Sequence, residues 1–334
     1  MVQQSKSSSG RTRRVLGVLV LLGWCAPLSA QDAANEPSIP LIDPACVTIQ
    51  PLTGDGFIVE QTSGRLVRWS DASLDVVAPD VRIVRKDIQQ LIGLTLRAGN
   101  RLTLLGVGQG GAALATWAIH SDKPATLEEG LSGPLGFADE DVVKGIASTD
   151  PALFIISNAG AAGSIWKIDA GRATLGKAKR IYTAPSRNIH AITVSRQGHL
   201  AVAWSDSVKE ENSQPGQETV PADPGQSAQT AGRIWLSFHH AETGQPITEV
   251  PIDAKQIRSL SFGPRGLLYA IGESAGDEDG LLRLDAAFEN RPVVRVTLLR
   301  AMQNAIGIAC PSSAKPSVML MGGESGQAVR IELN

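Results

Sequence analysis

Aromatic residues and cysteines are both scarce in this sequence. Phenylalanine, tryptophan and tyrosine make up 4% of the 334 residues, and with three cysteines at most one disulfide can form. The net charge of −2 gives no broad basic surface for nucleic acid. Beyond residue 30, no apolar run approaches the ~18 residues of a membrane-spanning helix. The Gly-x-Ser-x-Gly match at 272–276 falls in an expected loop between strands, not at the strand-to-helix turn of a serine hydrolase.

The first thirty residues have the pattern of an export signal. Arg11, Arg13 and Arg14 precede an apolar run at 15–24, and small residues follow at 27–30. We therefore expect a signal peptide over 1–30, a single mature domain over 31–334, and a periplasmic or secreted location. With 43% apolar residues, a chain of this length can bury a large core.

A short strand-like phrase recurs six times along the chain, usually opened by glycine. Examples are GRLVRWS from Gly64, GSIWKID from Gly163 and GLLRLD from Gly280. The other copies begin at Gly111, Gly232 and Gly326. Most steps between copies are about 50 residues, which suits one four-stranded propeller blade. The repeat predicts an all-β fold: a six-bladed β-propeller with four-stranded blades.

The last repeat has no room for a fourth strand. Strands expected at 305–310, 318–321 and 329–333 use the chain up to its end, whereas the strand-like segment 37–42 precedes the first repeat. We expect this N-terminal strand to complete the last blade and close the ring, which would leave no open sheet edge.

Two cysteines, Cys46 and Cys310, remain once the signal is removed. Both fall in expected innermost strands, one in the first blade and one in the last, and these blades are neighbours only in a closed ring. Exported proteins keep disulfides. The sequence therefore predicts a Cys46–Cys310 disulfide, with two unrelated buried thiols as the alternative.

One segment, 207–231, departs from the strand pattern. It is rich in Ser, Gln, Glu, Gly and Pro, and its only larger apolar residues are valines. Such a composition cannot bury a core. We expect a disordered insertion between the second and third strands of the fourth blade.

The phrases SLSFGPRGLLYAIG and AITVSRQGHLAVAW resemble the strand-turn-strand repeats of six-bladed propellers of the TolB-like, NHL and SMP-30/gluconolactonase-like group. The resemblance covers the mature chain at the level of architecture. It implies docking scaffolds, metal-dependent lactonases or quinone-dependent sugar dehydrogenases. Lactonase-like members hold a divalent ion with Glu, Asn and Asp near the blade starts. The positions compared are Gln90, Lys144, His190, Arg258 and Asn304, of which only Asn304 matches.

Four polar residues near the starts of innermost strands form the candidate ligand site: Lys144, His190, Arg258 and Asn304. In a propeller these positions share one face around the mouth of the central channel, so the four side chains are predicted to converge from successive blades. They would bind a small polar or anionic ligand, with His190 titrating near neutral pH. The alternative is that they only bond water and neighbouring backbone.

An acidic loop at 273–279 offers several carboxylates, so calcium is a weak alternative to having no cofactor. No catalytic residue is assigned. The sequence favours an exported, monomeric, non-catalytic binding or scaffolding module, whose partner is a protein or a small ligand. The alternative is a channel-centred enzyme, either a lactonase-like hydrolase or a quinone-dependent sugar dehydrogenase.

Overall fold

The computed structural model describes residues 38–40, 44–49, 55–70, 74–78, 80, 85–121, 123–171, 173–207, 233–263, 266–287, 293–302, 305–310, 317–322 and 327–332. All of them belong to the compact unit Glu36–Asn334. The predicted signal peptide and residues 208–231 of the predicted insertion lie outside the described residues. Export and the disorder of the insertion therefore stay predictions.

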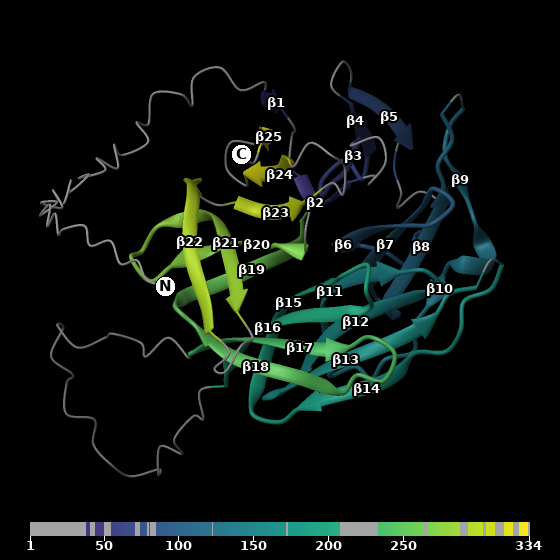
Figure 1. Ribbon diagram of the computed structural model, residues 1–334. Helices are drawn as coiled ribbons and strands as arrows, with labels where there is room; N and C mark the ends of the chain where they lie inside the picture. Colours follow the sequence, from purple (N-terminus) through teal and green to yellow (C-terminus); the bar gives the residue numbers. More distant parts are fainter. Residues whose placement is uncertain are drawn as a thin grey trace, which may run out of the picture. The chain divides into compact units, whose positions relative to one another are not determined.

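The regular structure of the described residues is almost entirely β, as predicted. The short 3₁₀ turn η2 (Glu129–Leu131) is the helical element among them. No helix in this part of the chain has the length and apolar character to cross a bilayer. The strands form five hydrogen-bonded sheets (Figure 1).

The first two sheets come from the N-terminal third of the described chain. One has the order β2-β3-β4-β5. Its strands are β2 (Pro44–Ile49), β3 (Gly56–Glu60), β4 (Leu66–Trp69) and β5 (Leu74–Ala78). The other contains β6, β7 and β8, with two short strands beside β8. These are β6 (Gln90–Arg97), β7 (Arg101–Gly108), β8 (Gly111–Ala118), β9 (Thr126–Leu127) and β10 (Gly133–Pro134).

The eight-stranded sheet is two four-stranded halves joined at a single parallel pair, Ala162 with Arg187. The first half is β11 (Val142–Thr149), β12 (Ala152–Ala159), β13 (Ala162–Asp169) and β14 (Lys179–Ala184). The second half is β15 (Arg187–Val194), β16 (His199–Asp206), β17 (Ile234–His240) and β18 (Pro246–Ile252). Within each half, consecutive strands pair antiparallel.

The last two sheets follow the sequence prediction closely. The fourth is β19 (Ala254–Phe262), β20 (Leu268–Ser274), β21 (Asp279–Ala287) and β22 (Val293–Ala301). The fifth has the order β1-β25-β24-β23, from β23 (Ala305–Ala309), β24 (Ser317–Gly322), β25 (Gln327–Glu332) and β1 (Ser38–Pro40). The pairing of β1 with β25 puts the N-terminal strand on the sheet where the sequence predicts it.

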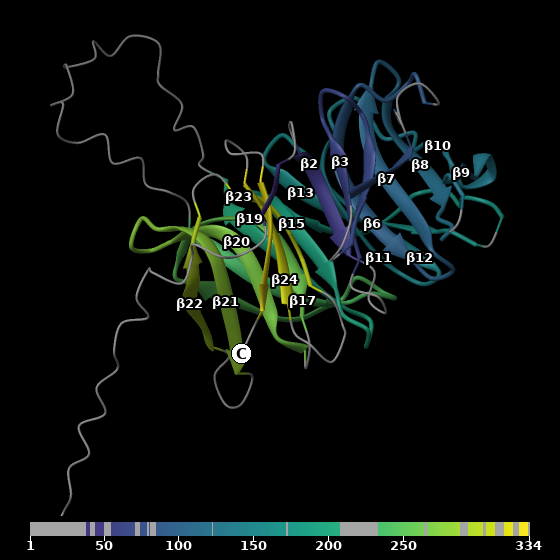
Figure 2. The same ribbon diagram turned by 90° about the horizontal axis from the view of Figure 1, so that it is seen from above.

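The first strands of the five sheets, and of the second half of the eight-stranded sheet, lie next to one another. We call β2, β6, β11, β15, β19 and β23 the innermost strands. Each contacts the next in this order, and β23 also contacts β2 (Figures 1 and 2). Apolar side chains from neighbouring units pack between the sheets, as where Trp117 of β8 and Leu94 of β6 join Phe57 of β3 in one buried cluster. Burial of such flat and branched side chains holds the sheets face to face.

Candidate functional site

A cavity of about 710 Å³ runs along the innermost strands, and all six of them contribute lining residues. This volume is in the range of small-molecule sites. Because the lining comes from strand backbones fixed by ladder hydrogen bonds on at least one side, its shape is set by the fold rather than by loops. We call it the central cavity.

Every innermost strand carries a one-residue irregularity where it pairs with the second strand of its unit. In each case one residue is skipped in the register, which is the signature of a β-bulge. One of the two irregularities of β19 skips Lys255. The other skipped residues are Ala45, Ile92, Lys144, His190, Arg258 and Ile306. We call these the bulge positions.

The bulge has a packing cause that can be followed in β15. Ile189 and Ile192 belong to the same buried cluster, although residues three apart in a regular strand face opposite sides. The extra residue between them, His190, restores the same side. The same spacing recurs in β6, where Leu91 and Leu94 share a cluster across Ile92. Apolar residues therefore fix the backbone, and the bulge residue is displaced from the regular pattern.

Three of the four predicted site residues lie at bulge positions and line the central cavity: Lys144, His190 and Arg258. Asn304 lies outside the described residues, and the bulge of β23 falls at Ile306 instead. In β6 the equivalent position is Ile92, not Gln90. In these two strands the positions compared from the sequence, Gln90 and Asn304, therefore precede the equivalent bulge positions by two residues.

His190 is held by a serine of the neighbouring strand. Its Nε2 lies 2.7 Å from Ser205 Oγ of β16. Burial lowers the pKa of His190 below its ordinary value of 6.5, and the nearby charge of Lys144 lowers it further. The imidazole is therefore mainly neutral at pH 7, so it can accept or donate one hydrogen bond at the cavity.

Arg258 is more constrained than the sequence suggested. Its Nε donates to the backbone oxygen of Ala305 at 3.0 Å, and one terminal nitrogen donates to Gln256 Oε1 at 3.0 Å. The other terminal nitrogen pairs with Asp279 of β21. Arg258 thus ties β19 to β21 and to the start of β23, and Asp279 offsets much of its charge. Asp279 and Ser205 were not predicted as parts of the site.

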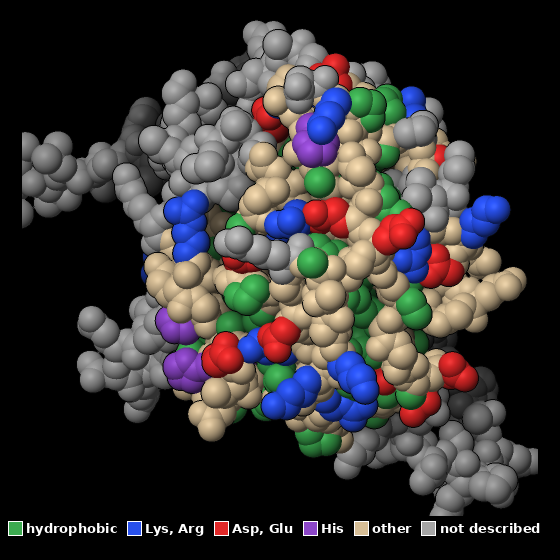
Figure 3. Space-filling model, turned by 90° about the vertical axis from the view of Figure 1, so that its right-hand side faces the viewer, with side chains coloured by type: hydrophobic (Ala, Val, Ile, Leu, Met, Phe, Trp, Pro, Cys, Tyr) green, Lys and Arg blue, Asp and Glu red, His purple; other side chains and the backbone are tan. Residues whose placement is uncertain are grey.

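Lys144 is exposed and, among the described residues, makes no ion pair. The described lining of the cavity contains no Asp or Glu, so its charge is of one sign. On the outer face drawn in Figure 3, by contrast, basic and acidic side chains are interspersed. The cavity is therefore the place where an anion would meet uncompensated positive charge.

Solved structures share this arrangement of strands over most of the chain. The PQQ-bound form of an aldose sugar dehydrogenase from Streptomyces coelicolor is 10% identical, with a TM-score of 0.53, over 90% of this chain and 98% of that one. A gluconolactonase from Xanthomonas campestris is 11% identical, with a TM-score of 0.55, over 88% and 87%. A chain of a mitotic checkpoint complex is 12% identical, with a TM-score of 0.52, over 90% and 95%. The fold is a β-propeller. At such identities the likeness shows the fold alone, and neither a model of a known protein family nor a curated protein sequence matches the chain.

The two cysteines of this propeller line the central cavity as free, buried thiols, so the predicted Cys46–Cys310 disulfide is not formed in the structure. Cys46 is the first residue after the bulge of β2, whereas Cys310 is the fourth after that of β23. Burial raises the pKa of each thiol to about 12, which suppresses the reactive thiolate.

The acidic loop of the propeller does not gather into a metal site. Asp277 pairs with Lys255, and Asp279 pairs with Arg258. Across the part of the chain that the structure describes, no group of three His, Cys, Asp or Glu side chains could hold a metal ion. The described residues of the cavity likewise offer no carboxylate to a divalent cation.

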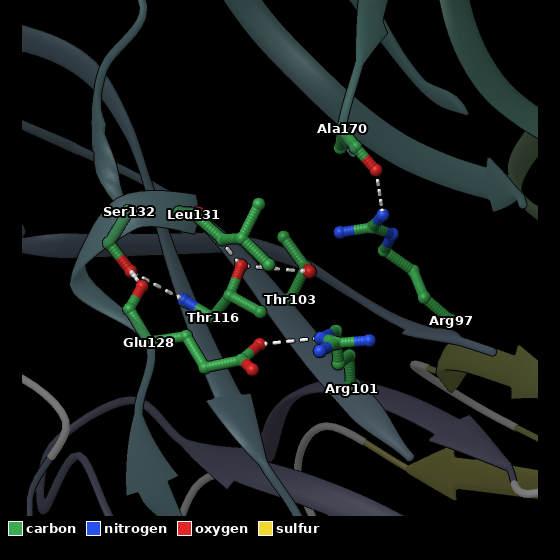
Figure 4. Close-up of polar contacts among 8 residues, drawn as sticks. All are labelled: Arg97, Arg101, Thr103, Thr116, Glu128, Leu131, Ser132 and Ala170. Carbon is green, nitrogen blue, oxygen red and sulfur yellow. Dashed lines mark hydrogen bonds and ion pairs between the residues drawn. The ribbon is translucent and has the colours of Figure 1, made fainter. Parts of the chain in front are cut away.

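A second basic group lies buried away from the cavity, at the end of β6. Arg97 is 6% exposed, and one of its terminal nitrogens donates to the backbone oxygen of Ala170 (Figure 4). Its Nε and other terminal nitrogen have no partner. Burial lowers the pKa of this guanidinium. Arg97 does not line the central cavity. Nearby, Arg101 and Glu128 form an ion pair at 2.7 Å that does not include Arg97 (Figure 4).

Proposed function

We propose that the propeller has six blades closed into a ring by the N-terminal strand. Five four-stranded units and one five-stranded unit, the cyclic contacts of the innermost strands and the pairing of β1 with β25 support this count and closure. A closed ring leaves one concave place shared by all blades, which is the central cavity.

We further propose that this cavity is the functional site and that it binds a small, carboxylate-bearing ligand. The observation that carries the proposal is the set of basic side chains at successive bulge positions, Lys144, His190 and Arg258, around a cavity whose described lining has no acidic residue. Bulges next to sites re-aim side chains. Lys144 supplies an unpaired charge, and His190 supplies a hydrogen-bonding group.

A channel-centred enzyme is better supported than the scaffold favoured by the sequence. The histidine with the lowered pKa and the uncompensated charge face an interior cavity, where a small molecule fits and a protein partner does not. The sugar dehydrogenase and gluconolactonase folds show that this architecture is compatible with such activities. The fold alone does not choose among them.

Between the two enzyme classes, the described residues suit a quinone better than a metal. A divalent cation would meet Lys144 and Arg258 with no carboxylate lining the cavity. A quinone that bears carboxylates, such as PQQ, would find charge complementarity at Lys144 and at the remaining N–H groups of Arg258. When bound, such a quinone accepts electrons from an alcohol. His190, largely neutral at pH 7, is placed to take up a proton at Nδ1 or to hold one there.

The test is a calorimetric titration of the purified protein with PQQ, and with citrate as a redox-inert carboxylate. We expect both to bind, and Lys144→Met to weaken both by about 1 to 3 kcal/mol, the range for a charged hydrogen bond. Lys179→Met on β14 is the matched control, because Lys179 is exposed and does not line the cavity.

If neither compound binds, or if wild type and Lys144→Met bind them equally, the anion site is overturned. Binding of citrate without PQQ would keep the anion site and exclude the quinone. Hydrolysis of a lactone that depends on an added divalent cation would decide for the lactonase instead.

A further inference from the structure

The lining of the central cavity is divided into two walls of different chemistry. The first comes from β11, from β15 with the turn that follows it, and from β19, which are consecutive around the cavity. It carries every charged or titratable basic residue of the described lining, namely Lys144, His190, Arg196 and Arg258. It also carries most of the hydroxyl groups, including Ser148, Thr149, Thr193, Ser195, Ser259 and Ser261, together with apolar residues such as Ile192, Val194 and Phe262. We call it the basic wall.

The second wall comes from β23, β2 and β6, and we call it the apolar wall. Its described lining residues include no charged side chain. They are Cys46, Val47, Thr48, Ile92, Gly93, Leu94, Thr95, Gly307, Ile308, Ala309 and Cys310. The hydroxyl groups on it belong to Thr48 and Thr95, and that of Thr95 is bonded to Ser148 at 2.7 Å.

The thiols belong to the apolar character of this wall. With pKa values raised to about 12 by burial, Cys46 and Cys310 stay protonated at any physiological pH. A protonated buried thiol behaves as a small hydrophobic group and a weak hydrogen-bond donor. The side chains of the apolar wall thus offer a ligand surface to pack against and few groups to bond to, so hydrogen bonds at this wall would come mainly from the strand backbones.

We propose that the occupant of the central cavity is an amphipathic carboxylate, with its anionic group toward Lys144 and His190 and a hydrocarbon or aromatic body against the apolar wall. This rests on the proposed anion site and adds the class of ligand. A sugar acid of similar size fits the basic wall as well, but the side chains of the apolar wall would offer its hydroxyl groups few partners in place of water. Each unsatisfied hydroxyl weakens binding.

Three probes separate the contributions of the two walls. They are 4-phenylbutyrate, which has a carboxylate and an apolar body; gluconate, which has a carboxylate and a polyol body; and 4-phenylbutan-1-ol, which has the body without the charge. In calorimetric titrations at pH 7 we expect 4-phenylbutyrate to bind at least about tenfold more tightly than either of the others.

Two variants assign the effect to the walls. Lys144→Met is expected to reduce the affinity for 4-phenylbutyrate to that for the alcohol. Val47→Thr, which keeps the side-chain shape but adds a hydroxyl to the apolar wall, is expected to weaken 4-phenylbutyrate and leave gluconate unchanged. Val107→Thr on β7 does not line the cavity and serves as the matched control. Ile92→Thr repeats the test on another strand if Val47→Thr does not fold.

The outcomes distinguish this inference from the proposal on which it rests. Gluconate binding as tightly as 4-phenylbutyrate would overturn the amphipathic ligand and leave the anion site standing. The alcohol binding as tightly as 4-phenylbutyrate, with no effect of Lys144→Met, would overturn the anion site and the carboxylate with it. No binding of any probe at millimolar concentration would overturn both.

Discussion

The basic and apolar walls of the central cavity share the same backbone bulge but differ in charge, because the basic side chains of the described lining all lie on the basic wall. In both, each strand pairs through a one-residue bulge, flanked by apolar residues that pack into the blade interface, as Leu91 and Leu94 do on the apolar wall and Ile189 and Ile192 on the basic wall. The bulge residue itself is free to differ, because packing constrains its neighbours and not its own side chain. The repeat thus fixes the same backbone irregularity in each innermost strand, while the residue at the bulge position differs between the two walls.

The largest expected effect comes from the residue that joins the basic wall to the next blade. Arg258 bonds the backbone of Ala305 and pairs with Asp279. Arg258→Met should lower the free energy of unfolding by about 1 to 3 kcal/mol, since a carboxylate only about one-fifth exposed loses its ion pair with Arg258.

Lys144→Met is the control for that measurement, because Lys144 is exposed and makes no ion pair with a described residue. Its unfolding by urea should match wild type within about 0.5 kcal/mol. Equal stabilities of the two variants would show that Arg258 is not a structural tie.

The next effect concerns the glycine that follows the bulge on each wall. A Cβ added at Gly93, on the apolar wall, would lie 2.9 Å from Ile146 Cγ2, and that methyl belongs to a stiff β-branched side chain. At Gly145, on the basic wall, the closest atom would be Ile156 Cδ1 at 3.4 Å. Gly93→Ala should therefore cost about 1 to 2 kcal/mol of stability, and Gly145→Ala much less.

Denaturant unfolding of the two alanine variants measures this difference directly. Neither glycine has a positive φ angle, so any loss of stability measures crowding around the added methyl group and not backbone strain. If both variants are equally stable, Ile146 crowds Gly93 no more than Ile156 crowds Gly145.

A smaller effect is expected from pH. Burial lowers the pKa values of both His190 and the fully buried His239, which bonds Ser237 Oγ at 2.8 Å. The unfolded chain therefore binds more protons than the folded one below pH 6.5, so stability is complete above that pH and falls as the pH drops toward the lowered values. Lys144, facing His190, adds to its shift.

Urea titrations between pH 7.5 and 5 measure the pH effect. His190→Gln should lose less stability on acidification than wild type, and His239→Gln should likewise flatten the profile. A wild-type profile that does not change across this range would contradict the lowered pKa values of both histidines.

Much of the scaffold was predictable from the sequence, and much of the site was not. The strands of the fourth sheet and the placement of β1 follow from apolar alternation and repeat length, which local sequence records. The bulges also have a four-residue pattern in the sequence: apolar, any residue, small, apolar. Examples are VKGI from Val143 and IHAI from Ile189. Reading that spacing would have identified Ile306 rather than Asn304 as the equivalent of Lys144.

What the sequence could not predict depends on pairs of strands. Ser205 reaches His190, and Asp279 reaches Arg258, through contacts set by the register of neighbouring strands. The two cysteines are free thiols in the structure although their strands are neighbours, and their positions relative to the bulges differ. The local sequence indicates which strand a residue belongs to, but it does not indicate which residues of the neighbouring strand lie beside it.

The smallest expected effect contrasts Arg258 of the basic wall with the buried Arg97. All three nitrogens of Arg258 have partners, whereas two of those of Arg97 have none (Figure 4). Arg97→Met removes one hydrogen bond to Ala170, which destabilises the fold, and also removes a poorly satisfied buried charge, which stabilises it. These effects oppose each other, so the free energy of unfolding should stay within about 1 kcal/mol of wild type. A loss as large as that of Arg258→Met would mean that water or a nearby group such as Asp150, whose charge acts on Arg97, satisfies the guanidinium in solution. The contrast between a paired and an unpaired arginine would then disappear.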